Sequence, residues 1–214
     1  MTRADTGAPE PGGDRGGIDF PAYLRLAIPV GLLFAVVYFT LNWLTAQRAR
    51  HYRLYFDWEL SIPFVPAMIY VYASILVLFL LPPVLLRRRA FAALAGAMVV
   101  VILVAAASFL LLPAEPGFQR PVQVPGYDAV FQTLYALDQR YNLVPSLHVA
   151  CSALCIAALL HADPRALIKL GLLLWAGLLS VSVVLVHQHH LLDVATGWLL
   201  GLAAYQLVYL PRSA

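Results

Sequence analysis

Residues 90–112 read AFAALAGAMVVVILVAAASFLLL, a run of 23 residues that contains no charged side chain. A helix needs about 20 predominantly apolar residues to cross the hydrocarbon core of a bilayer. Every backbone polar group in that core must be hydrogen-bonded within its own segment, which an α-helix achieves along its whole length. The run therefore predicts a transmembrane α-helix.

Five further apolar runs of similar length occur along the chain. They are residues 26–44, 64–86, 143–160, 166–186 and 191–210. Hydrophobic residues make up 62% of the 214 residues and charged residues only 12%, whereas soluble domains carry roughly 25% charged residues. No internal repeat is visible. We therefore expect an all-α polytopic membrane protein whose six transmembrane helices form one bundle.

The region before the first run has a different composition. Residues 1–20 are rich in Gly, Pro, Asp and Arg and contain no apolar run, which predicts a disordered cytoplasmic tail. The membrane domain then covers residues 21–214. The run at 26–44 is too long for a cleaved secretory signal, so we expect it to remain as a membrane anchor.

The arginine triplet Arg87-Arg88-Arg89 is the strongest signal for orientation. It lies in a very short loop, and a cytoplasmic N-terminus puts nine of the 14 Lys and Arg residues on the cytoplasmic side. The positive-inside rule then predicts cytoplasmic N- and C-termini in a bacterial inner (plasma) membrane. The net charge is +3, but no basic stripe with interleaved aromatic residues is present. We expect membrane lipids, and not nucleic acid, as partners.

The loops after the first and third runs face outward in this topology. Residues 45–63 combine three arginines with several aromatic rings, so they form either an interfacial belt or part of a lipid headgroup site. Residues 113–144 contain five apolar side chains on one helical face, which predicts a short interfacial helix on the membrane surface or over the bundle. These side chains are Tyr127, Val130, Phe131, Leu134 and Leu137.

Ionisable residues at the ends of membrane runs are costly, so they are usually functional or paired. His148 in the fourth run and His189, His190 and Asp193 at the sixth lie at the same outward face in this topology. His189 and Asp193 are four residues apart and share one side of a helix. Such a carboxylate can hold one ring nitrogen and leave the other free as a nucleophile or base. His190 and His187 remain open alternatives, as does a cluster that serves packing alone.

Pro145 and Ser146 precede His148, a pattern typical of the first turn of a helix. The free N–H groups there attract anions, so the segment is either a phosphate site with a proton donor or an ordinary helix start. Cys151 and Cys155 show neither zinc spacing nor a disulfide framework and are expected to be buried thiols. No third carboxylate or thiolate is in register with the His–Asp pair, so we expect no metal and no other cofactor.

The combined pattern is more specific than its parts. Pro145-Ser146-Leu147-His148, followed later by His189-x-x-x-Asp193, resembles the type 2 phosphatidic acid phosphatase superfamily. That family carries K-x6-R-P, then P-S-x-H, then S-R-x5-H-x3-D. The second motif is complete here. In the third, Ser182, His189 and Asp193 are in place, and Arg120-Pro121 matches the end of the first.

Two cations of the family motifs are absent from this chain. Pro113 stands at the Lys position of the first motif and Val183 at the Arg position of the third. A branch that includes inositol phosphorylceramide synthases and many bacterial relatives tolerates such losses. Its members often carry D-x3-N-x2-P-S-x-H and a Q-H pair in the third motif. The matching residues here are Asp138, Asn142, Pro145, Ser146, His148, Gln188 and His189.

The resemblance implies a metal-independent phosphoric monoester hydrolase that acts on a lipid phosphate of the phosphatidic acid or polyprenyl phosphate type. His189 would attack phosphorus and form a phosphohistidine, Asp193 would orient His189, and His148 would protonate the leaving group. The phosphate would be bound by Arg120, Ser146 and Ser182, with Arg140 as a replacement for the missing cations.

Two other functions remain open from the sequence. A transferase would use the same covalent step but pass the phospho-headgroup to an alcohol in place of water. A transporter would instead use ionisable residues near the membrane midplane, often within internal repeats. Here the ionisable residues gather at one face, which favours an enzyme.

Overall fold

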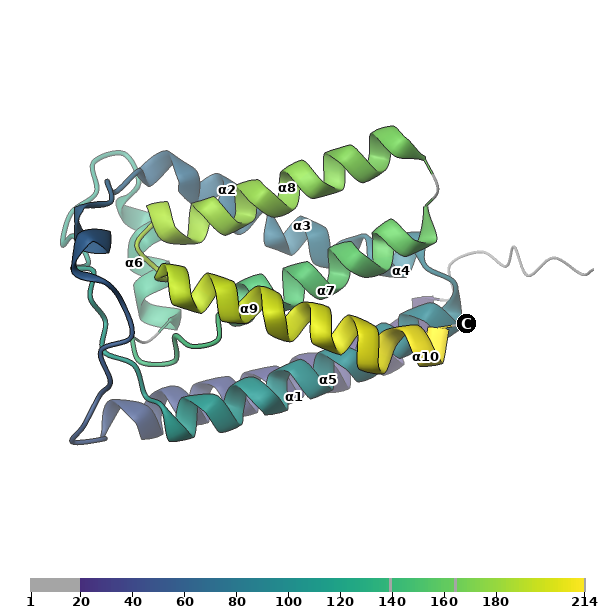
Figure 1. Ribbon diagram of the computed structural model, residues 1–214, viewed down its shortest axis with the longest axis horizontal. Coiled ribbons are helices and arrows are strands. Elements are labelled where there is room, and N and C mark those ends of the chain that lie inside the picture. The colour runs from purple at the N-terminus through teal and green to yellow at the C-terminus, as the bar shows by residue number, and fades with distance from the viewer. Residues whose placement is uncertain (1–19, 139, 164, 214) are drawn as a thin grey trace, which may run out of the picture.

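The computed structural model describes residues 20–138, 140–163 and 165–213, and within them the chain is an all-α polytopic membrane protein without a β-strand. The long helices run along one common direction (Figure 1). The α-helices are α1 (Phe20–Ala46), α2 (Ile69–Ala73), α3 (Ile75–Leu80), α4 (Pro82–Leu85), α5 (Arg88–Leu111), α6 (Asp128–Leu137), α7 (Leu147–Ala162), α8 (Ala166–Leu185), α9 (Leu191–Ala204) and α10 (Leu210–Ser213). Two short 3-10 turns, η1 (Asp57–Ser61) and η2 (Pro66–Met68), and a π-helical turn, η3 (Tyr205–Tyr209), complete the set.

Six apolar helical segments coincide with the six predicted runs, which confirms the predicted fold class. Five are long enough to cross a membrane, and one is shorter. The five are Tyr23–Ala46, Pro66–Leu85, Arg88–Leu111, Ala166–Leu185 and Leu191–Ser213, and the shorter one is α7. The second segment is divided into η2, α2, α3 and α4, and Pro82 and Pro83, which lack a backbone N–H, begin its last piece.

The fourth segment differs from its predicted bounds. Helix α7 begins at Leu147, not at residue 143, because Ser146 is its N-cap and accepts a hydrogen bond from the Val149 N–H at 3.3 Å. The helix is about 24 Å long at about 1.5 Å per residue, which is less than a typical hydrocarbon core. It is buried along most of its length, so neighbouring helices and not lipid surround it.

Helices α7 and α9 pack closely through two glycines of α9. A Cβ atom on Gly197 would lie 2.8 Å from the Ser146 carbonyl oxygen, and one on Gly201 would lie even closer to that of Ala150. Neither position has room for a side chain. The Gly-x-x-x-Gly spacing therefore brings the two backbones together, as is common between membrane helices.

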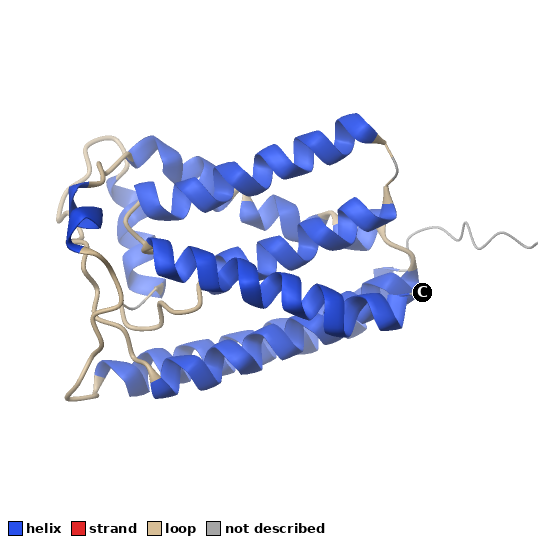
Figure 2. Ribbon diagram, viewed as in Figure 1, coloured by secondary structure: helices blue, strands red, loops and turns tan. Residues whose placement is uncertain are grey.

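The loops and the predicted interfacial helix gather at one end of the bundle. Figure 2 shows that α6 and the long irregular segments lie at this end, with the C-terminus at the other. Helix α6 confirms the short helix predicted between the third and fourth spans. The arginine triplet lies at the C-terminal end, where the Arg89 Nε donates to the Arg212 carbonyl oxygen at 3.2 Å. The predicted tail, residues 1–20, lies outside the described residues except for Phe20, where α1 begins.

Candidate active site

Asp193 in the first turn of α9 contacts His189, which precedes the helix. The four-residue spacing predicted both residues on one helix, but the backbone is helical only from Leu191 onward. The His189 Nδ1 lies 3.2 Å from the Asp193 Oδ2, and both side chains are buried. The same oxygen accepts the backbone N–H of His190 at 2.8 Å. Sequence spacing left the choice between the two histidines open; in the structure both contact Asp193, but only His189 does so with its ring. A carboxylate at Nδ1 fixes the ring orientation and leaves the His189 Nε2 available for chemistry.

Glu59 holds the ring of His190 and the start of α9. Its carboxylate is fully buried. The Oε2 atom accepts the Leu191 N–H at 2.8 Å and lies 3.3 Å from the His190 Nδ1, while Oε1 accepts the Phe56 N–H at 2.9 Å. Two carboxylates, Glu59 and Asp193, thus share the free N–H groups of one helix N-terminus. Glu59 could not be predicted from sequence spacing, because it stands in η1, far from α9 along the chain.

His187 and His190 belong to a stack of aromatic rings. The order is Tyr55, His190, Phe118 and His187, with ring centroids 4.5, 4.2 and 4.0 Å apart and nearly parallel planes. The His187 Nε2 also lies 3.0 Å from the Ile62 carbonyl oxygen. Burial lowers the pKa of both histidines. These contacts engage both rings in packing the loops against α9.

The Pro-Ser-Leu-His segment at the start of α7 lies directly against the first turn of α9. The Ser146 N–H donates to the Asp193 carbonyl oxygen at 3.0 Å. The ring centroids of His148 and His189 are 5.8 Å apart. Two histidines from different sequence motifs therefore face each other across the closely packed α7–α9 interface.

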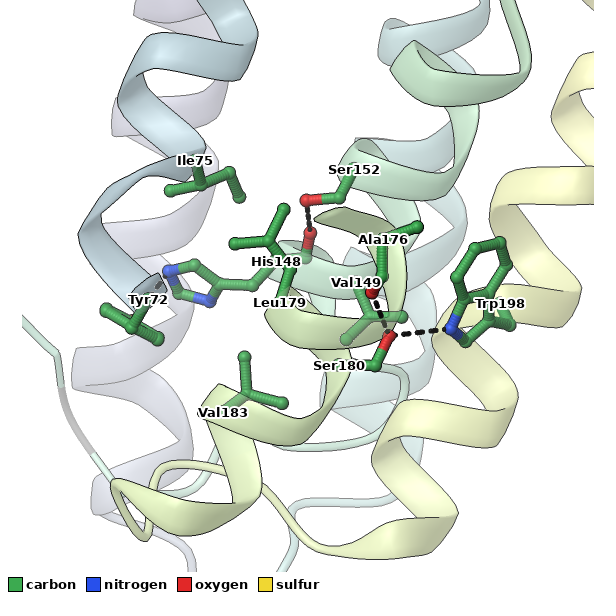
Figure 3. A pocket seen from close by; sticks show the side chains of 10 residues that line it. All are labelled: Tyr72, Ile75, His148, Val149, Ser152, Ala176, Leu179, Ser180, Val183 and Trp198. Atoms are coloured by element: carbon green, nitrogen blue, oxygen red, sulfur yellow. Dashed lines mark hydrogen bonds between the residues drawn. The ribbon is translucent and has the colours of Figure 1, made fainter. Parts of the chain in front are cut away.

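His148 has a hydrogen-bonding partner that sequence analysis missed. The Tyr72 hydroxyl of α2 lies 2.7 Å from the His148 Nε2. Figure 3 shows both side chains at one side of a small cavity. Val183, at the Arg position of the third motif, also lines it. An apolar side chain thus occupies the place of that motif's cation, and Tyr72 holds the ring of His148.

Arg120 lies beside the residue that precedes His189. One of its guanidinium nitrogens donates to the Gln188 Oε1 at 3.3 Å, and the other donates to the Asp138 carbonyl oxygen at 2.7 Å. The guanidinium carbon lies 4.7 Å from the centre of the Tyr135 ring. Burial lowers the pKa of Arg120, but an arginine remains charged in proteins. Arg140 is exposed and lines the same small pocket as Arg120 and Gln188.

The other predicted phosphate-binding residues are used locally. The Ser182 hydroxyl is fully buried and donates to the Leu179 carbonyl oxygen of its own helix at 2.8 Å. Ser146 caps α7 with its hydroxyl. Across the described parts of the chain, no three His, Cys, Asp or Glu side chains are grouped so that they could bind a metal ion.

The Asp-x3-Asn segment joins the site to α1. The Asp138 carboxylate accepts a hydrogen bond from the Tyr38 hydroxyl. The Asn142 side chain donates to the Asn42 Oδ1 at 2.8 Å and accepts from the Thr45 hydroxyl at 2.9 Å. These contacts fix the loop that leads from Arg120 to His148 against the first span.

Comparison with protein families shows that residues 48–207 match the PAP2 superfamily. The search of curated proteins found no match. Members of this superfamily are phosphatases or related phosphotransferases, which makes the chain an enzyme that acts on phosphoesters. The matched region includes every side chain of the site described above except those contributed by α1, and it covers most of the chain. The protein is therefore a member of the PAP2 superfamily.

Proposed function

We propose that this protein hydrolyses a lipid phosphate monoester through a covalent phosphohistidine at His189. The observation that carries the proposal is the pairing of His189 with His148, whose ring centroids are 5.8 Å apart. Asp193 holds the Nδ1 side of His189. Two histidines on either side of a phosphoryl group can act as nucleophile and as general acid.

In the first step, the His189 Nε2 attacks phosphorus and the bond from phosphorus to the lipid oxygen breaks. His148 gives its proton to that oxygen, so the lipid leaves as an alcohol. In the second step, water attacks the phosphohistidine, His148 takes a proton from the water, and the bond between nitrogen and phosphorus breaks. Inorganic phosphate is released and both histidines return to their starting states.

The charge of the phosphoryl group needs cations and N–H donors. Arg120 and Arg140 line one pocket beside Gln188, which precedes the proposed nucleophile. The first turn of α7 adds Ser146 and its N-terminal backbone donors. Phosphoryl transfer depends mainly on positioning and charge stabilisation. Because two cations of the family motifs are missing, Arg120 supplies most of the positive charge that stabilises the phosphoryl group. Ser182 has a supporting role in the wall behind this site.

A phosphotransferase is the second candidate, and the Asp138–Asn142 segment favours it. These residues match the branch that resembles inositol phosphorylceramide synthases, and both are held by α1. In that reaction, an acceptor alcohol replaces water in the second step, and the product is a new phosphoester.

The arginine triplet at the opposite end of the bundle supports an active site on the extracytoplasmic face.

A panel of lipid phosphates tests the proposal. The purified protein is incubated with phosphatidic acid, a polyprenyl phosphate and a water-soluble phosphoester, and released inorganic phosphate is measured. His189→Ala should abolish release. His161→Ala is the matched control because His161 is exposed near the other end of α7. Full activity of His189→Ala would reject the hydrolase proposal. Transfer of the phosphoryl group only to an added alcohol, with no release of phosphate, would also reject it.

A further inference from the structure

A large apolar chamber lies between α1 and helices α3, α5 and α7, and His148 is part of its lining. Its volume is about 500 Å³, within the range of roughly 300–1,000 Å³ that is usual for ligand pockets. We call it the α1 chamber because α1 forms one wall, with the other walls made by α3, α5 and α7. Its lining includes Gly31, Tyr38, Phe79, Met98 and His148.

The chamber has one polar end and one apolar end. At the polar end, His148 and Tyr38 line it, and the Tyr38 hydroxyl donates to Asp138. At the other end, the rings of Tyr23 and Phe91 pack together with their centroids 5.1 Å apart. Such a chamber fits a molecule with one charged end and a long hydrocarbon chain.

The length of the chamber can be estimated along α1. Tyr23 and Tyr38 both line it, and their separation on a helix is about 22 Å at about 1.5 Å per residue. Half of the hydrocarbon core of a bilayer is about 15 Å thick. A chain that fills the chamber therefore reaches past the middle of the membrane.

We propose that the α1 chamber binds the hydrocarbon tail of the lipid phosphate and selects for long chains. The proposal rests on the function assigned above to His148, because that side chain is part of the chamber's lining. A lipid whose phosphate lies between His148 and His189 needs an apolar space for its tail beside His148. The α1 chamber is such a space, and binding of a remote chain can contribute to the rate of the chemical step.

Gly31→Leu tests the proposal by filling the chamber. Gly31 lines it, and a Cβ atom there would meet no heavy atom within 4 Å. Leucine is also a better helix former than glycine, so the variant should fold. Gly177→Leu on α8 is the matched control, because Gly177 is exposed, also has free space around its Cβ position and lies outside the chamber.

The assay is phosphate release from phosphatidic acids with short, medium and long acyl chains. We expect Gly31→Leu to lower kcat/KM at least tenfold for long chains and less than twofold for short chains, with Gly177→Leu unchanged. Phe91→Ala, which enlarges the apolar end, should shift the preference to longer chains. An equal loss for all chain lengths, or no loss for any, would overturn the proposal.

Lipid retention separates this inference from the proposed function. If the wild-type protein releases phosphate from none of these lipids, the proposed hydrolase function is wrong. Native mass spectrometry can still test whether the chamber binds a lipid phosphate. The wild-type protein should retain an added long-chain lipid phosphate, and Gly31→Leu should lose it. Equal retention by both proteins, or retention of a bilayer phospholipid that lipid phosphate does not displace, would overturn the chamber's role.

Discussion

Replacement of Glu59 by glutamine keeps the shape of a buried side chain and removes its charge. The carboxylate accepts three hydrogen bonds, from the Phe56 N–H, the Leu191 N–H and the His190 ring. A glutamine has only one acceptor oxygen. In its better orientation that oxygen stays with Leu191 and His190, and the Phe56 N–H is left facing an NH₂ group.

The cost of Glu59→Gln follows from these contacts. A buried N–H without an acceptor costs about 1–3 kcal/mol, and each remaining bond loses about 1 kcal/mol when its acceptor becomes neutral. The variant should therefore be less stable by about 3–5 kcal/mol. For a chain of this size, 1 kcal/mol shifts the melting temperature by about 2–4 °C, so we expect a decrease of roughly 6–20 °C.

Activity should fall as well, because Glu59 holds the turn that carries His189. A misplacement of about 1 Å can reduce the rate about 100-fold, and the loss should appear in kcat more than in KM. The assay is thermal unfolding in detergent together with phosphate release. Glu115→Gln is the control, because Glu115 is exposed in a neighbouring loop. If Glu59→Gln melts and turns over like Glu115→Gln, the carboxylate does not hold α9 as described.

Three further changes test other contacts of the site. Tyr72→Phe removes the hydroxyl at the His148 Nε2 and should lower kcat about tenfold or more, most strongly for poor leaving groups; a uniform small effect would argue against a role through His148. Gly197→Ala puts a methyl group against the Ser146 carbonyl, so it should cost about 1–3 kcal/mol of stability and lower kcat strongly. Gly177→Ala is the control, and an unchanged kcat of Gly197→Ala would show that close α7–α9 packing is dispensable. Burial lowers the pKa of His190, so the unfolded state binds more protons and the free energy of unfolding falls as pH drops through about 6.5. His190→Gln should make the free energy of unfolding, measured by chemical denaturation, depend less on pH. An unaltered pH dependence would assign it to other groups.

The fold could be predicted well because its signal is local. Each apolar run carries its own prediction of a helix, and all six runs coincide with helical segments. The bounds of α7 were less predictable, because residues 143–146 are apolar enough to continue the run but lie in the loop that leads into the Ser146 cap. Helix α6 was also predictable, since its apolar side chains repeat with helical spacing.

The proposed catalytic residues were predictable as a group but not in their contacts. The spacing of His189, His190 and Asp193 allowed either histidine to be the partner of the carboxylate, and in the structure the two use different atoms. Glu59 and Tyr72 could not be found from spacing. Their partners lie 131, 132 and 76 residues away along the chain, and only the packing of the helices brings them together.

The most direct test of the central proposal is the site of covalent phosphorylation during turnover. Rapid quenching at high pH, followed by digestion and mass spectrometry, should find an acid-labile phosphate on His189, attached at Nε2 because Asp193 holds Nδ1. His189→Ala should abolish this label, and His190→Ala should retain it. A phosphate on another residue, or full turnover by His189→Ala, would contradict the proposal.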